Sequence, residues 1–471
     1  MNILKNNKTI LILILLLGFL LRIWNLNKPE GLWNDEYIVY TISMLKFPFD
    51  FFEGIRSNCH APLHYFYLKL WMMVFKNSDF MLRMSSLVPN FLGCSVMYFV
   101  GKNYQTKNSS IKIGLCCAAI ASISSFLIYF SQEVRIYSMI FLFSSLILLF
   151  SIKMYENPSK QNAICLTFFS ILLILEHTIG FVFVLFNIFA LIAFRQKKKK
   201  KDKNNDYYKK MLAWLVLCLP IVPFIFRLFL HPTYFSQWWS PFNWSKIFFY
   251  FTDLFSPVLK NLTNSPDSFY GQIISVNGNL NIGFVLFALI PSLIALFLIM
   301  KAILDKKRIN KYLLTVFLTV FLTVLIAAIV GKIVFLTKYL TELYPILILF
   351  AAVGWNNLYS KNTKITLATI YLFMSLFFIV VSHTSAPKLV RTEGQRLPIL
   401  TMNEMGIKKN DKILFLFYPK KSFLKYYNDN DYTAYTISKY NFPEVYNKGT
   451  IKDAFECGHE LYKVFFKSKR C

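Results

Sequence analysis

The fold of this chain depends on the placement of one segment, His60-Ala-Pro-Leu-His-Tyr-Phe-Tyr-Leu-Lys-Leu-Trp-Met-Met-Val-Phe75. If this segment crossed a membrane, the next apolar segment would run outward and leave Lys102, Lys107 and Lys112 outside. If it lies in the interface, these lysines are inside, as the positive-inside rule prefers. The segment is short for a span, and its two His, one Lys and several aromatic residues suit an interfacial helix. We therefore place it in the interface.

The composition indicates a polytopic membrane protein. Of the 471 residues 56% are hydrophobic and only 16% are charged, which is too much apolar surface for a soluble core. The net charge of +28 comes largely from short runs between apolar segments; residues Arg195–Lys210 hold nine Lys or Arg against two Asp. Such runs mark the cytoplasmic side of a membrane, so we do not expect nucleic-acid binding.

We expect about eleven transmembrane helices. The basic Met1–Lys8 stays inside, and no small-residue cleavage site follows the first apolar segment, so the first span is uncleaved and runs outward. With the interfacial placement of 60–75, the charges of all later loops agree with the positive-inside rule. The expected spans are about 9–25, 83–101, 113–130, 137–152, 162–176, one ending at Arg195, 211–229, 281–300, 312–330, one beginning after Tyr339, and 364–382.

Two regions follow from this topology. Residues 1–383 form a transmembrane domain in the cytoplasmic membrane, with a first outer loop at 26–82 and an aromatic outer loop at 230–279. Residues 384–471 lie outside as a small α/β domain. There, Lys412–Tyr418 is typical of a buried strand, Ser422–Asn428 of a helix, and Tyr432–Ile437 of a second strand.

Two adjacent acids, Asp35 and Glu36, stand in the sequence Leu32-Trp-Asn-Asp-Glu-Tyr37 shortly after the first span. Beside an apolar wall, a carboxylate is partly desolvated and can act as a general base. The alternative is structural: Asn34 caps a short helix from Asp35 to Lys46, whose first turn carries acids because they suit a helix N-terminus. Both interpretations can hold together.

The expected topology collects further ionisable residues at the outer ends of the spans. Such residues are costly beside hydrocarbon and are functional by default. Acids together with cations suit a reaction in which a base removes a proton while an anionic leaving group is stabilised. Structural alternatives remain: Arg83 can be an interface anchor, Glu133 and Arg135 a local ion pair, and His177 a packed histidine. The residues are His60, Arg83, Glu133, Arg135, Glu176, His177, Lys332 and Lys338.

Five motifs in order along the membrane region resemble those of the protein mannosyltransferase-like family. This family comprises membrane glycosyltransferases of the C-type fold, similar to protein O-mannosyltransferases and to bacterial aminoarabinose transferases of lipid A. Each motif alone is weak, and the ordered set is more specific. The motifs are Trp33-Asn-Asp-Glu36, His60-Ala-Pro-Leu63, Leu82-Arg-Met-Ser-Ser86, Ser131-Gln-Glu-Val-Arg-Ile-Tyr137, and Lys338-Tyr-Leu340 ahead of Pro345.

The resemblance implies transfer of a sugar, with inversion, from a polyprenyl-phosphate carrier to an acceptor on the outer side. It implies that Asp35, with Glu36 beside it, is the catalytic base or orients the acceptor, and that Glu133 is a second acid. Arg83, Arg135 and Lys338 would hold the donor phosphate, with Tyr339 as a hydrogen-bond donor. Apart from the resemblance, we expect His60 and His177 to line the site. Ala61 stands where the aminoarabinose transferases have a Lys, which argues against a lipid A substrate.

No cofactor is required by this interpretation. A divalent metal ion held by Asp35, Glu133 and His60 is conceivable from ligand chemistry, although no close spacing supports it. The expected partners are the polyprenyl-phosphate-linked sugar, membrane lipid, and a protein, glycan or lipid acceptor. A transporter or flippase of lipid-linked intermediates is the alternative, but transporters commonly show internal repeats and mid-membrane sites, and neither is visible here. A ligase or polymerase of surface polysaccharide shares the chemistry and differs in its acceptor.

Overall fold

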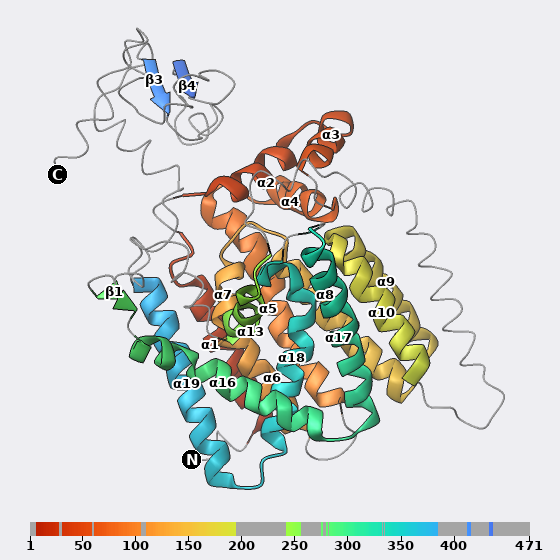
Figure 1. Ribbon diagram of the computed structural model, residues 1–471. Coiled ribbons are helices and arrows are strands. Elements are labelled where there is room, and N and C mark those ends of the chain that lie inside the picture. Colours follow the sequence, from red (N-terminus) through yellow and green to blue (C-terminus); the bar gives the residue numbers. More distant parts are fainter. Residues whose placement is uncertain are drawn as a thin grey trace. The chain divides into compact units, whose positions relative to one another are not determined.

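A bundle of long apolar helices dominates the computed structural model (Figure 1). The structure describes residues 6–27, 31–58, 61–104, 110–194, 242–255, 275–276, 279–280, 282–331, 333, 335–384, 412–415 and 433–436. The chain divides into two units, one of residues 1–26 with 42–389 and the other of 27–41 with 390–471, and we describe each by itself. The helix bundle belongs to the first unit.

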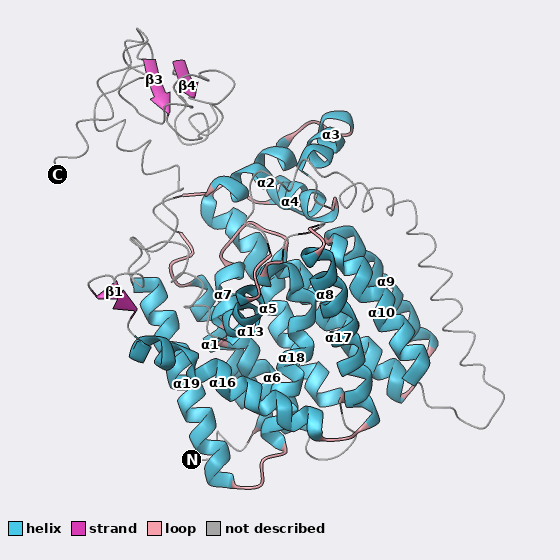
Figure 2. Ribbon diagram, viewed as in Figure 1, coloured by secondary structure: helices cyan, strands magenta, loops and turns pink. Residues whose placement is uncertain are grey.

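The described part of the first unit is almost entirely helical (Figure 2). Its N-terminal half holds α1 (Asn7–Ile23), the end of α2 (Asn34–Met44), α3 (Phe49–Asn58), α4 (Leu63–Val74), α5 (Asp79–Asn103), α6 (Ser110–Ser122), α7 (Ser125–Ser131), α8 (Tyr137–Glu156), α9 (Lys160–Glu176) and α10 (Thr178–Phe194). Its C-terminal half holds α13 (Ser245–Phe255), the short antiparallel pair β1 (Ser275–Val276) and β2 (Asn279–Leu280), α16 (Ile282–Leu304), α17 (Arg308–Ile329), the 3₁₀ turn η3 (Thr337–Leu343), α18 (Tyr344–Asn356) and α19 (Lys361–Thr384).

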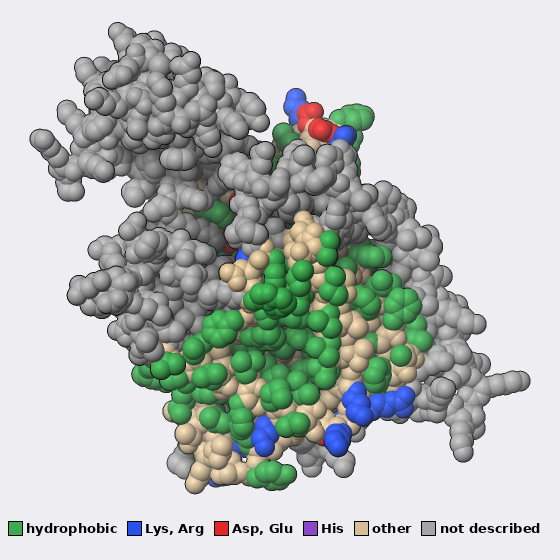
Figure 3. Space-filling model, in the orientation of Figure 1, with side chains coloured by type: hydrophobic (Ala, Val, Ile, Leu, Met, Phe, Trp, Pro, Cys, Tyr) green, Lys and Arg blue, Asp and Glu red, His purple; other side chains and the backbone are tan. Residues whose placement is uncertain are grey.

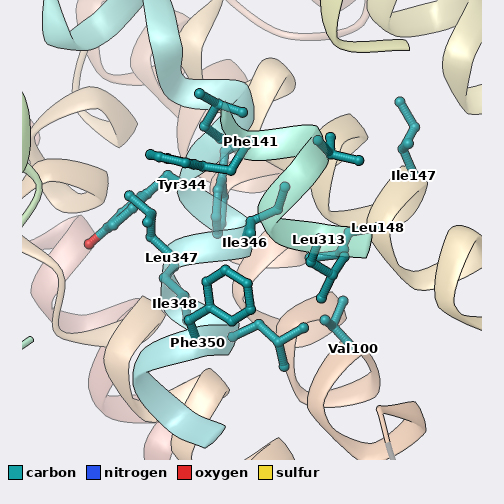
Figure 4. Close-up of a cluster of buried hydrophobic side chains, with 14 of the residues drawn as sticks. Val100, Phe141, Ile147, Leu148, Leu313, Tyr344, Ile346, Leu347, Ile348 and Phe350 are labelled. Atoms are coloured by element: carbon teal, nitrogen blue, oxygen red, sulfur yellow. The ribbon is translucent and has the colours of Figure 1, made fainter. Parts of the chain in front are cut away.

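The core of the bundle forms where α5 and α8 pack together and α18 packs against them. Figure 4 shows side chains from several helices meeting there, among them Val100, Phe141, Leu148, Leu313 and Phe350. Every residue of α18 from Tyr344 to Gly354 is buried. A helix that is apolar on all sides and buried on all sides sits inside the bundle rather than at its lipid face.

Glycines let two helix pairs approach closely, as small residues do in membrane helices. A Cβ on Gly101 of α5 would lie 2.8 Å from the backbone of Gly114 on α6, and one on Gly114 would lie 2.7 Å from the carbonyl oxygen of Tyr98. A Cβ on Gly354 of α18 would overlap the carbonyl oxygen of Leu298 on α16. These crossings have no room for a larger side chain.

The helices lie close to the expected spans. Five described helices are long and apolar enough to cross a membrane, or six if α6 and α7 count as one, and α10 is a shorter apolar helix. In Figure 3 a broad hydrophobic area lies above a lower rim that carries Lys and Arg. The fold is therefore that of a polytopic helical membrane protein. The expected span at 211–229 and the basic run Arg195–Lys210 lie outside the described residues.

The expected span at 113–130 is broken, which corrects the sequence prediction of one continuous helix. Its two parts, α6 and α7, are bent by 56°. The break has a local cause, because the Ser124 hydroxyl accepts a hydrogen bond from the Leu127 N–H at 3.3 Å and caps a new helix. Helix α13 in the aromatic loop and helix α3 were also not expected.

The segment that determined the topology forms α4, a helix of 12 residues. At 1.5 Å per residue it is about 18 Å long, short of the roughly 30 Å of a hydrocarbon core. The Lys69 ammonium donates to the carbonyl oxygens of Ser43 at 3.1 Å and Leu45 at 2.7 Å. This explains a lysine in an otherwise apolar helix, since it caps the end of α2.

In the second unit, β3 (Lys412–Phe415) and β4 (Thr433–Thr436) pair in parallel, with Lys412 opposite Thr433. Both strands lie inside the segments that the sequence indicated as strands. The helix expected at Ser422–Asn428 lies outside the described residues.

Candidate functional site

Two of the expected site motifs hold the chain where it leaves α1. The side-chain amide of Gln132 donates to the carbonyl oxygens of Arg22 at 2.9 Å and Trp24 at 2.8 Å. The Arg83 guanidinium donates to the carbonyl oxygen of Leu26 at 3.2 Å. Both side chains are buried. Arg83 therefore helps to position this backbone. Its contact with Leu26 was not predicted from the sequence.

Arg22, in the last turn of α1, is fully buried, and it was not among the residues expected from the sequence. Its guanidinium donates to Asn90 Oδ1 at 2.9 Å and to the carbonyl oxygens of Gly18 at 2.9 Å, Ala121 at 3.0 Å and Ser122 at 2.8 Å. The carbonyls of residues 121 and 122 end α6, where the helix dipole is negative. The break between α6 and α7 is tolerated because Arg22 satisfies these carbonyls.

Two cations expected to hold a donor phosphate meet at one aromatic ring. The Arg135 guanidinium carbon lies 5.8 Å from the ring centroid of Tyr137, and the Lys338 ammonium lies 5.6 Å from the same centroid. Lys338 is also 5.6 Å from the ring of Tyr339. Arg135 and Tyr137 come from the segment that leads into α8, and Lys338 and Tyr339 from η3, about 200 positions away. Like charges gather at one place only where something favours them, such as an aromatic face or an anion.

The ring of His177 lies 6.2 Å from the ring of Tyr339 and extends this cluster. Its Nδ1 atom is hydrogen-bonded to a carboxylate oxygen of Glu342, and both side chains are nearly or fully buried. A buried carboxylate on one ring nitrogen fixes the tautomer and orientation of an imidazole. Glu342 was missed from the sequence, although an acid at the start of an apolar span was a signal.

A second buried pair links α4 to the end of α9. His64 Nδ1 lies 3.3 Å from Glu176 Oε1, and both side chains are at most 1% exposed. Within the described residues none of their side-chain nitrogen or oxygen atoms has a hydrogen-bond partner of good geometry. Burial and the nearby Glu176 raise the pKa of Tyr67, which stays a phenol and donates to the carbonyl oxygen of Ser85 at 2.9 Å.

Contacts from the N-cap of α7 and from α13 hold the turn that carries Lys338 and Tyr339. The Thr337 hydroxyl donates to Asp253 Oδ2 at 2.9 Å. Tyr344, directly after the turn, donates to the carbonyl oxygen of Leu254 at 2.7 Å, and its hydroxyl is 2.8 Å from that of Ser124. All five of these residues are buried. Because both ends of the 3₁₀ turn are held, it presents Lys338 and Tyr339 at defined positions.

The acid pair lies in the other unit, at the start of α2. The N–H of Tyr37 donates to the carbonyl oxygen of Trp33 at 2.9 Å, so Trp33 occupies the N-cap position. Glu36, three residues later, accepts the Trp33 N–H at 3.1 Å and is buried. This is the returning half of a capping box. It corrects the expectation that Asn34 caps the helix, because Asn34 is already its first residue. Asp35 is half-buried beside it.

The described contacts therefore join four of the expected residues, Arg135, Lys338, Tyr339 and His177, in one cluster. Glu133 is buried. His60 lies outside the described residues. In the part of the chain that the structure describes, no group of three or more His, Cys, Asp or Glu could hold a metal ion.

The fold has known counterparts, although no protein-family model and no curated protein matches the sequence. The crystal structure of ArnT from Cupriavidus metallidurans in the apo state matches 94% of this chain and 90% of that one, with a TM-score of 0.54 at 10% identity. The Archaeoglobus fulgidus oligosaccharyltransferase, tethered to an acceptor peptide with an NVT sequon, matches with a TM-score of 0.50 at 8% identity. That match spans 91% of this chain and 63% of the oligosaccharyltransferase. The chain has the C-type glycosyltransferase fold. The expectation of this fold is thus confirmed.

Proposed function

We propose that this protein is a glycosyltransferase that moves a single sugar from a polyprenyl-phosphate carrier to an acceptor on the outer face of the cytoplasmic membrane. The observation that carries the proposal is the meeting of Arg135 and Lys338 at the ring of Tyr137. In a chain with a C-type glycosyltransferase fold, two cations held together at the ends of membrane helices form a site for a phosphate. The aromatic ring offsets part of their mutual repulsion when the site is empty.

The proposed reaction is a single displacement with inversion. Asp35 removes the proton from the acceptor nucleophile as its lone pair attacks the anomeric carbon of the sugar. The bond from that carbon to the phosphate oxygen breaks, and the electron pair stays on polyprenyl phosphate, which gains a negative charge. Arg135 and Lys338 stabilise this charge, and Tyr339 donates a hydrogen bond to the same phosphate. His177, oriented by Glu342, lines the site beside Tyr339.

The other two acids, Glu36 and Glu133, have different proposed roles. Glu36 Oε2 accepts the Trp33 N–H, so we assign Glu36 to holding α2 rather than to proton transfer. Glu133 is buried one residue after Gln132, and we propose that it is a second acid of the site that acts on the acceptor. Arg83 contributes by fixing the backbone at Leu26.

The proposed topology has eleven spans, with the N-terminus inside and residues 384–471 outside as an α/β domain. The positions of the described helices relative to the predicted spans support it, as do the parallel strands β3 and β4. The proposed acceptor is a protein, a glycan or a lipid that reaches the outer face.

The test uses Asp35→Asn at the chromosomal locus, with Asp50→Asn as the matched control. Asp35 lies in the first turn of α2 and Asp50 in the first turn of α3. The control therefore reports the effect of removing an acid from the first turn of a short helix. We expect mass spectrometry of extracted lipids to show a polyprenyl-phosphate sugar that accumulates in Asp35→Asn only. The mass of that lipid identifies the sugar.

A second step separates transfer from transport. Purified native protein is incubated with the accumulated lipid and with membranes that supply the acceptor. A glycosyltransferase converts the lipid to free polyprenyl phosphate, whereas Asp35→Asn leaves it intact. A flippase moves the lipid without changing its mass. If folded native protein leaves the mass of the lipid unchanged in the presence of the acceptor membranes, the proposal is rejected.

A further inference from the structure

An apolar cavity of about 340 Å³ opens among α1, α6, α16, α18 and α19 of the helix bundle. In Figure 1, α19 lies at the edge of the bundle beside α16. Apart from Lys112, the side chains that line the cavity are uncharged, and nearly all of them are apolar. Within a membrane such a space is filled by hydrocarbon, because water has no polar partners there.

One end of the cavity carries positive charge. Lys112, near the start of α6, lines it together with Trp355, near the end of α18. The Lys364 ammonium lies 5.6 Å from the ring centroid of Trp355, and the indole N–H of Trp355 donates to the carbonyl oxygen of Lys364 at 3.2 Å. Trp and Lys together are typical of the headgroup level of a bilayer. In the proposed topology this is the cytoplasmic level.

The opposite end is uncharged. Ile123 and Phe255 line it, and the ring of Phe255 lies 5.6 Å from that of Tyr344. The cavity thus has an apolar lining that suits hydrocarbon and one charged end that suits an anion. Its lining and charge match a lipid with an acyl chain and an anionic headgroup.

Helix α19 has a reason to need such a lipid. Of its apolar window only 28% is buried within the protein, against 83% for the window that includes α18. The rest of this window faces outward, and on the inner side of α19 the cavity lined by Leu367, Ala368 and Tyr371 leaves the seam with the bundle incompletely packed. Because unfilled space in a packed interior costs free energy, an acyl chain in the seam stabilises the attachment of α19.

We propose that this cavity binds one anionic phospholipid of the cytoplasmic leaflet, with an acyl chain between α19 and the bundle and its phosphate at Lys112 and Lys364. The occupant is not the proposed sugar donor. The donor phosphate belongs near Arg135 and Lys338, so its polyprenyl tail would bring no charge to the Lys112 end. The proposal does not depend on the glycosyltransferase function, since the bound lipid would hold α19 in place whatever reaction the protein catalyses.

The experiment measures lipid retention by the full chain purified in mild detergent. Native mass spectrometry follows incubation with equimolar dioleoyl phosphatidylglycerol and dioleoyl phosphatidylcholine. We expect one phosphatidylglycerol per native chain, and at least a fivefold lower ratio of bound phosphatidylglycerol to phosphatidylcholine in the double variant Lys112→Gln/Lys364→Gln. The matched control is Lys311→Gln, because Lys311 is an exposed lysine on α17 that does not line the cavity.

A second variant fills the cavity. Ala368→Phe places a ring among the lining residues, and we expect it to abolish retention of the lipid. This variant can also disturb folding. The result for Lys112→Gln/Lys364→Gln therefore decides, because these two lysines are exposed or half-exposed. Equal retention of both lipids by the native chain, an unchanged ratio in the lysine variant, or a bound polyprenyl lipid in place of phosphatidylglycerol would each overturn the proposal.

Discussion

His177 Nδ1 is hydrogen-bonded to the carboxylate of Glu342 across 165 positions of sequence, and both side chains are buried. The contact ties the α9–α10 corner to the turn that carries Lys338 and Tyr339. A buried pair of this kind positions a functional imidazole and also contributes to stability, and the two roles can be measured separately.

Removal of both partners should cost less stability than the sum of the two single removals. His177→Ala or Glu342→Ala leaves one buried polar group uncompensated, which costs about 3–5 kcal/mol. The double variant removes both groups, so its loss of stability should be smaller than the sum by about 1–3 kcal/mol. Thermal unfolding in detergent of the native protein, the two single variants and the double variant gives the coupling free energy between the two side chains. Additive losses would show that the contact is not formed.

Neutralising the cations at Tyr137 should slow turnover. Lys338→Met and Arg135→Met each remove charge stabilisation of the leaving phosphate, and we expect about a 100-fold lower kcat. Lys311→Met, an exposed lysine on α17, is the control and should leave kcat unchanged. Tyr137→Phe keeps the ring and should retain most activity, whereas Tyr137→Leu should not. If Tyr137→Phe were as slow as Tyr137→Leu, the hydroxyl rather than the ring would be the important group.

Glu36 offers a test between capping and catalysis. Glu36→Gln keeps an oxygen that accepts the Trp33 N–H, so transfer activity should stay within about threefold of native. Glu36→Ala loses this bond and about 0.5–2 kcal/mol of helix stability, and its activity should fall with the order of α2. Initial rates and hydrogen exchange of the α2 amides measure the two effects. A large loss in Glu36→Gln would return Glu36 to the catalytic acids.

The span positions were predictable because long apolar runs and lysine placement are local signals that the bilayer enforces directly. The expected spans at about 83–101 and 137–152 appear as α5 and α8 with modest extensions. The break at Ser124 was not predictable, since it depends on the capping of α7 and on Arg22, about 100 positions away, satisfying the carbonyls that end α6. Local sequence carries no information about such a partner.

The candidate site was predictable in its residue types more than in its contacts. Arg135, Lys338, Tyr339 and His177 were expected at one face, and their contacts join them in one cluster, while their roles stay a prediction. Glu342 was missed because its importance comes only from its partner, His177. Arg22 was missed because it ends an apolar segment where a snorkelling arginine is ordinary, whereas it is in fact fully buried.

Arg22 should be essential for stability. Arg22→Met leaves Asn90 and the carbonyl oxygens of Ala121 and Ser122 without their donor, at a cost of about 1–3 kcal/mol for each group that water cannot reach. Arg22→Lys restores the charge but lacks the planar fork, so it should recover only part of the loss. Lys8→Met, an exposed position on the same helix, is the control. Thermal unfolding in detergent should rank native and Lys8→Met above Arg22→Lys, and Arg22→Lys above Arg22→Met. A native-like Arg22→Met would mean that the end of α6 finds other donors, and the buried guanidinium would then need a different explanation.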